Sequence, residues 1–181
     1  MKNFKSRTVP FRRRREGRTD YKQRLRLLSS GKARLVVRIT GKNALAQAVV
    51  SEHGQDKVVV SAHSRELIGM GWQQGRKNLP AAYLVGRLAA KRCGAAGITD
   101  LIVDLGQQRS VKGSRIYALV KGVVDGGVVI PVDEKMFPSE ERLNGTHIIA
   151  YHGSAKERFT KSDAAKLAEQ RAAVLGAIEK S

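Results

Sequence analysis

The sequence contains one cysteine, few acidic residues and no long hydrophobic run. Cys93 is the only cysteine among 181 residues, which excludes an internal disulfide and a Cys-x-x-Cys zinc ribbon and favours a reducing compartment. The longest unbroken apolar runs span only a few residues, whereas crossing a bilayer takes roughly 20. We therefore expect no membrane span, and we interpret Cys93 as a core residue.

Acidic residues are scarce relative to basic ones. The chain has 16 Asp and Glu against 34 Lys and Arg, for a net charge of +18. Such an imbalance costs self-repulsion and usually reflects a polyanionic partner, with nucleic acid ahead of a membrane surface. Residues 11–26 remain basic and polar where the apolar part of a signal peptide would follow. We therefore expect a cytoplasmic protein that is not secreted.

Most of the excess charge lies in the first 34 residues, which hold 13 basic and 2 acidic side chains. Arg12 to Arg15 are consecutive, and few apolar residues precede Leu25, so this segment cannot bury itself and is expected to lack order without a partner. Guanidinium groups chelate phosphate oxygens bidentately, which indicates an RNA-binding arm. Phe11 and Tyr21 bracket the arginines and either stack on unpaired bases or pack against the domain.

From Leu35 the pattern changes to β-branched runs separated by turns, which is typical of strands. The first three predicted strands span residues 35–40, 45–50 and 58–62, and the short turns between them predict an antiparallel meander. Two further strands, at 98–104 and 128–130, are separated by helices, which implies parallel crossovers.

The helices follow from apolar spacing and end signals. A first-turn proline, Pro80, begins an alanine-rich helix that runs to Gly94, and Ser114 caps a second helix that ends near Asp125. A helical turn at 139–143 and a C-terminal helix at 162–179 complete the pattern. The prediction is an α/β domain over 35–152, with a mixed five-stranded sheet in the order β-β-β-α-β-α-β. A basic arm (1–34) precedes it and a helical extension (153–181) follows.

This strand order is shared by nucleases that hold two metal ions with carboxylates on the first and fourth strands. Here the first strand carries Arg38 and no carboxylate, and a cation there repels Mg²⁺. Asp100 and Asp104 lie at the ends of the fourth strand, and isolated acids are usually structural. We therefore expect no metal and no catalysis, with an RNA-processing nuclease kept as the alternative function.

A second basic feature is the loop at 107–115. Arg109, Lys112 and Arg115 converge with Gly113 and Ser114 on a helix N-terminus, which is a ready phosphate site. The alternative is a solvated loop without a ligand.

Several motifs occur in one order: RRRREGRTDY, LVVRIT, SAHSREL, NLPAAYLVGRLAA, KGSRIYALVKGVVDGG and PSEERLNGTHIIAY. Together they resemble the universal large-subunit ribosomal protein family "L eighteen" in its archaeal form, over about residues 11–151. The resemblance implies binding of 5S rRNA and its attachment to the large-subunit rRNA in the central protuberance, beside neighbouring ribosomal proteins. It also implies a ribonuclease H-like fold without the metal site, and neither cofactor nor enzymatic activity.

The resemblance assigns RNA contacts to three segments. The residues are Arg12, Arg13, Arg14, Arg15, Arg18, Thr19, Tyr21, Arg24 and Arg26 in the arm, His63, Ser64 and Arg65 after the third strand, and Lys112, Gly113, Ser114 and Arg115 in the loop. Gln107 and Gln108 depart from the pattern expected there.

Overall fold

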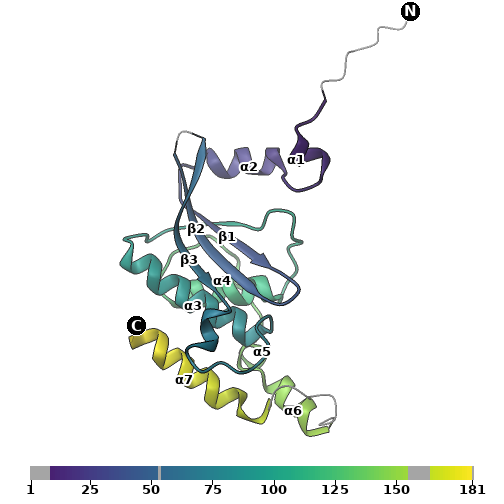
Figure 1. The fold of residues 1–181 in the computed structure, drawn as a ribbon, viewed down its shortest axis with the longest axis vertical. Coiled ribbons are helices and arrows are strands. Elements are labelled where there is room, and N and C mark those ends of the chain that lie inside the picture. Colours follow the sequence, from purple (N-terminus) through teal and green to yellow (C-terminus); the bar gives the residue numbers. More distant parts are fainter. Residues whose placement is uncertain (1–8, 53, 155–163, 181) are drawn as a thin grey trace, which may run out of the picture.

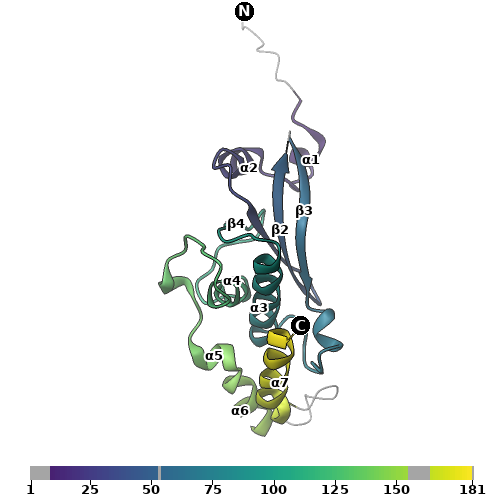
Figure 2. The ribbon, with the colours of Figure 1, turned by 90° about the vertical axis from the view of Figure 1, so that its left-hand side faces the viewer.

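The computed structural model describes residues 9–52, 54–154 and 164–180. A β-sheet forms the centre, with the N-terminal helices beyond one end of it and the C-terminal helix near the other (Figure 1). Two long helices cover one face of the sheet (Figure 2). In the described part of the chain no helix is long and apolar enough to cross a membrane.

The sheet comprises β1 (Arg34–Ile39), β2 (Ala44–Glu52), β3 (Gln55–His63) and β4 (Ile102–Asp104) in the order β3-β2-β1-β4. The first three strands pair antiparallel, which confirms the predicted meander. β4 pairs parallel to β1, which confirms a crossover. Successive side chains point to opposite faces, so Leu35 and Val37 are buried under the helices while Arg34 and Arg38 lie on the other face.

The predicted fifth strand, 128–130, is reduced to a single bridge. Val129 donates to the Thr99 carbonyl at 2.9 Å, and Leu101 donates to the Val129 carbonyl at 3.0 Å, which makes one parallel bridge. Pro131 follows and has no N–H to continue a ladder. The described residues therefore form a four-stranded mixed sheet, and the five-stranded ribonuclease H-like order is not reproduced.

The hairpin of β2 and β3 is longer than predicted. Residues 51–57, expected as a turn, mostly extend the strands: Ser51 pairs with Asp56, and Val50 pairs with Lys57. Gly54, with φ near 80°, supplies the left-handed conformation that the tight turn needs. The longer hairpin places Asp56 in a strand, close to the N-terminal helices.

The two helices on the covered face are α3 (Leu79–Ala95) and α4 (Arg115–Asp125), as predicted. Their backbones lie very close together at two glycines. A Cβ on Gly86 would lie 2.1 Å from the Leu119 carbonyl oxygen, and one on Gly122 would lie 2.2 Å from the Tyr83 carbonyl oxygen. Only glycine permits this approach. Cys93 of α3 is fully buried, which confirms its prediction as a core residue.

The remaining helical elements lie between β3 and α3 and after α4. They are the 3-10 helices η1 (Glu66–Ile68), η2 (Glu134–Met136) and η4 (Ala164–Lys166) and the helices α5 (Glu140–Asn144), α6 (Thr146–Ser154) and α7 (Leu167–Lys180). Helix α6 was not predicted. The predicted C-terminal helix is confirmed from Leu167, while residues 162 and 163 lie outside the described ranges. Helix α7 packs on α3, burying Val174 and Ile178.

Candidate nucleic-acid interface

The arginine-rich segment forms two short helices, α1 (Arg12–Arg15) and α2 (Tyr21–Leu28), where no regular structure was expected. Within the segment one acid pairs with two of the arginines, and a hydroxyl accepts a hydrogen bond from a third. Glu16 accepts from Arg12 Nε at 2.8 Å and pairs with Arg18 at 3.1 Å. Arg13 Nε donates to the Thr19 hydroxyl at 2.9 Å.

Helix α2 begins at a capping residue that the arm itself supplies. One carboxylate oxygen of Asp20 accepts from the backbone N–H groups of Lys22 and Gln23, at 2.9 and 3.2 Å, which satisfies two orphan donors of the first turn. The rings of Tyr21 and Phe11 contact each other, with centroids 5.4 Å apart and a 49° angle. Phe11 stays 72 % exposed, so this contact leaves one aromatic ring open to solvent.

A chain of ion pairs joins α2 to the sheet. Arg24 Nη2 lies 2.9 Å from one oxygen of Asp56, and Arg34 Nη2 lies 2.6 Å from the other. Arg34, which is 2 % exposed, also pairs through Nη1 with Asp104 at 3.0 Å. Burial raises the pKa of Asp56, but the hydrogen bond and charge of Arg34, followed by those of Arg24, outweigh it and lower the pKa below 3.8.

Asp100 and Asp104, the two acids considered as metal ligands of a nuclease, both pair with basic side chains. Asp104 pairs with Arg34 and accepts from the Gly106 N–H at 2.9 Å. Asp100 pairs with Lys32 at 2.6 Å. Within residues 9–52, 54–154 and 164–180 no three His, Cys, Asp or Glu side chains gather as a metal site would require. The Asp104 carboxylate on β4 therefore binds the Arg34 side chain.

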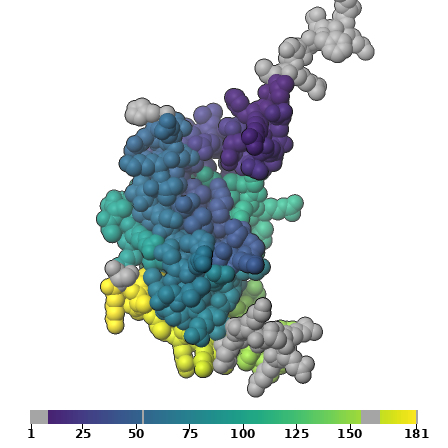
Figure 3. All heavy atoms as spheres, in the orientation of Figure 1, coloured from purple at the N-terminus to yellow at the C-terminus, as the bar shows by residue number. Residues whose placement is uncertain are grey.

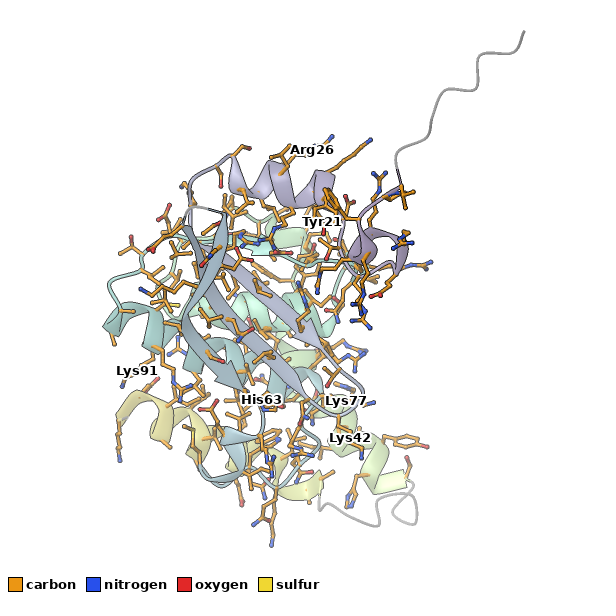
Figure 4. The ribbon with its side chains drawn as sticks, turned by 45° about the horizontal axis from the view of Figure 1, so that its top comes forward. Tyr21, Arg26, Lys42, His63, Lys77 and Lys91 are labelled. Carbon is orange, nitrogen blue, oxygen red and sulfur yellow. The ribbon has the colours of Figure 1, made fainter. Side chains whose placement is uncertain are left out.

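The turn after β3 exposes only part of its predicted RNA contacts. His63 Nδ1 accepts from the Arg65 N–H at 2.9 Å, and the Arg65 side chain is exposed. Ser64 is fully buried, and its hydroxyl accepts from the Ala44 N–H at 3.1 Å, so its side chain has a structural role. Figure 4 shows His63 far from Tyr21 and Arg26 of the arm. The structure therefore does not bring this turn and the arm together.

The loop at 107–115 is fastened to the sheet by Gln108, whose amide oxygen accepts from the Ile39 N–H at 3.3 Å and whose amide nitrogen donates to the Ile39 carbonyl at 2.8 Å. Lys112 and Arg115 are exposed at its far end. Gly113, with φ near 67°, donates its N–H to the Met136 carbonyl and so does not offer it to a ligand.

Ser114 occupies the N-cap position of α4, but its side chain does not cap the helix. Its hydroxyl oxygen is buried and has no hydrogen-bond partner among the described residues. The predicted side-chain cap is therefore wrong, although the predicted helix start is right.

Two hollows connect the loop with other basic elements. One of about 300 Å³ lies between Gln107 and the arm, where Arg14 and Tyr21 line it. Another of about 530 Å³ lies at the N-termini of α3 and α4, lined by Arg115 and Arg142 among others. The arm and the loop therefore adjoin, and Figure 3 shows the arm as a lobe at one end of the molecule.

Sequence reasoning missed the basic residues that tertiary contacts bring to these hollows. Lys77 and Arg142 line the larger hollow together with Arg115, and Arg38 lines a further groove between the arm and the sheet. For Arg38 a signal existed, since alternation along β1 places it on the face opposite Leu35 and Val37, away from the core. For Lys77 and Arg142 no local pattern distinguishes them from other surface cations.

The chain is similar in sequence to a family of known proteins. The family described as "Ribosomal large subunit proteins 60S L5, and 50S L18" matches residues 4–102. The "Large ribosomal subunit protein uL18" of Korarchaeum cryptofilum is 48% identical over 158 residues, covering 84% of this chain and 81% of that protein. The proteins of the same name from Methanococcus maripaludis and Natronomonas pharaonis are 48% and 46% identical, covering 82% and 86% of this chain and 77% and 85% of their own lengths. A match over more than half of the chain, together with relatives aligned over most of both lengths, means that this chain belongs to the uL18 family of large-subunit ribosomal proteins.

Proposed function

We propose that this protein binds 5S rRNA and attaches it to the large-subunit rRNA in the central protuberance, beside neighbouring ribosomal proteins. The observation that carries the proposal is the docked basic arm. Arg14, Arg15 and Arg26 project as exposed cations without an ion pair in the described part of the chain. Exposed arginines on two ordered helices suit a phosphate backbone.

Membership in the uL18 family makes the chain a structural, non-enzymatic component of the large ribosomal subunit. The nuclease alternative is therefore set aside. The buried pair of Arg34 and Asp104 agrees with this, because a carboxylate neutralised by arginine at 3.0 Å is a poor ligand for Mg²⁺.

The proposed RNA contacts come from the arm and from two separate places on the domain. The arm (1–34) grips phosphates without regard to sequence, and the domain (35–152) reads RNA shape through the exposed Lys112 and Arg115. His63 and Arg65 contact a separate stretch of RNA at the far end of the sheet. The extension (153–181) contributes α7, which supports α3.

Two variants test this division. Replacing Arg12 to Arg15 with alanine deletes up to four phosphate contacts, so the slope of log affinity against log salt becomes shallower by roughly 3 units. Affinity falls for every RNA. Replacing Lys112 and Arg115 with alanine instead lowers discrimination, because these cations stand on a folded scaffold and depend on RNA shape.

The measurement is binding of each variant to 5S rRNA and to an unrelated RNA of equal length across a salt series. An arm variant that keeps its full salt slope would refute the proposed phosphate contacts of Arg12 to Arg15. A loop variant that loses affinity equally for both RNAs would refute shape reading. No preference of the wild-type protein for 5S rRNA would refute the proposed function.

A further inference from the structure

A groove of about 110 Å³ lies between the arm and the uncovered face of the sheet. Arginines from both parts line it: Arg13, Arg18 and Arg24 from the arm and Arg38 from β1. We propose that this groove binds a phosphate group of an RNA backbone and that Arg38 is an RNA-binding residue of the folded domain. The proposal rests on the RNA-binding function above and adds a site within it.

The two acids in the groove are turned to internal partners. Asp20 accepts from two backbone N–H groups of α2, and Asp104 pairs with Arg34 and accepts from the Gly106 N–H. The lining therefore carries four guanidinium groups and two carboxylates. Arg18 and Arg24 also pair with Glu16 and Asp56, which lie outside the lining. The net positive charge of the lining attracts an anion.

Arg38 is held in place before any ligand arrives. Its Nη1 donates to the Val37 carbonyl at 2.7 Å and to the Asp104 carbonyl at 3.0 Å, while Nη2 lies 3.8 Å from an Asp104 oxygen. No hydrogen bond engages Nε or Nη2 within the described part of the chain, and the side chain is 37 % exposed. Since Nε and Nη2 form one edge of the guanidinium, they offer a preorganised fork for two oxygens of one anion.

Gly106 provides the space that this placement needs. Its φ is near 56°, and a Cβ there would lie 2.8 Å from Arg38 Nη2 and 3.0 Å from Cζ. A larger residue there would push the guanidinium away from its present position. The loop after β4 and the polar face of β1 thus build the floor of the groove together.

The donor set favours phosphate over a carboxylate. A carboxylate presents two oxygens, and one arginine fork occupies both. A phosphate group presents more acceptors, so guanidiniums of the arm and of Arg38 engage it at once.

The first test compares Arg38→Gln and Arg38→Lys with Lys180→Gln, which removes one exposed cation at the end of α7. Binding to 5S rRNA is measured across a salt series, with folding checked by circular dichroism. We expect Arg38→Gln to weaken binding roughly tenfold or more and to reduce the salt slope by about 0.7 to 0.9. Arg38→Lys keeps the slope but loses affinity, since it lacks the fork. The control keeps affinity within about threefold.

The second test uses the wild-type protein, so it does not depend on any variant folding. The Nε–Hε resonance of Arg38 is followed by NMR during titration with a short oligoribonucleotide and, separately, with a poly-aspartate peptide. A saturable shift with the oligoribonucleotide and little change with the peptide is expected. A shift with the peptide alone would overturn the phosphate assignment in favour of an acidic protein partner.

The outcomes separate the site from the proposed function. If the wild type prefers 5S rRNA but Arg38→Gln matches Lys180→Gln in affinity and salt slope, the groove is not a phosphate site and the proposed function stands. If the wild type shows no preference for 5S rRNA while the oligoribonucleotide still shifts Arg38, the site stands as a general RNA site and the 5S assignment fails.

Discussion

Replacing Asp56 with asparagine removes the carboxylate that joins Arg24 of α2 to Arg34 of β1. The variant loses two ion pairs, of 2.9 and 2.6 Å, and leaves Arg34 with Asp104 as its one charged partner among the described residues. Hydrogen bonds to charged groups contribute about 1.5 to 3 kcal/mol when buried and under 1 kcal/mol when exposed. Because the Asp56 side chain is 30 % exposed, we expect a loss of about 1 to 2 kcal/mol.

That loss lowers the melting temperature by about 2 to 8 °C for a domain of this size. It also affects RNA binding, because an arm that is no longer docked must be ordered by the RNA at a cost in affinity of about three- to tenfold. Simple charge counting predicts the opposite, since the variant is one unit more positive and should bind a polyanion more tightly. The direction of the change therefore decides between positioning and net charge.

Glu52→Gln is the matched control, because Glu52 lies on the same hairpin, is exposed and has no ion pair in the described part of the chain. Thermal unfolding and 5S rRNA binding of both variants are measured at neutral pH. Binding by Asp56→Asn that equals or exceeds that of Glu52→Gln would refute the docking role. Because the folded pKa of Asp56 is depressed, its contribution is present above pH 3.8 and is lost as the pH falls below that value.

Two further predictions concern the core. Gly86→Ala places a Cβ 2.1 Å from the Leu119 carbonyl oxygen and should lower the free energy of unfolding, measured in urea, by about 2 to 4 kcal/mol. The control is Gly94→Ala on the same helix, where a Cβ has no atom within 4 Å, and it should be neutral or stabilising by up to about 1 kcal/mol. Equal effects of the two variants would contradict the close packing of α3 on α4. Burial, followed by the hydrogen bond to Asp125, raises the pKa of Tyr83 to about 12, so its contribution to stability is full below pH 10 and is lost as the pH rises toward 12. Ultraviolet titration should show one tyrosine that ionises near pH 12, and this ionisation should be absent from Tyr83→Phe. If it persists in Tyr83→Phe, the assignment of the raised pKa to Tyr83 is wrong.

The sequence by itself determined the features that depend on local pattern and composition. The strand β1, the helices α3 and α4 and the antiparallel meander follow from periodicity and end signals that lie within a few residues of each element. The basic arm follows from charge counting, because a segment with 13 cations and few apolar residues has no core-facing stripe. Family motifs indicated the ribosomal role for the same reason: they are continuous stretches of chain.

Only the tertiary structure decided how the charged residues are partnered. Arg34 and Asp104 are 70 residues apart in sequence yet share a buried hydrogen bond. Asp56, which the sequence predicts in a turn, lies in β3. No local pattern encodes such pairings, because they depend on which strands become neighbours in the sheet. The placement of α2 and the groove at Arg38 follow from those pairings, since Asp56 of β3 joins Arg24 of α2 to Arg34 of β1, which in turn pairs with Asp104 of β4.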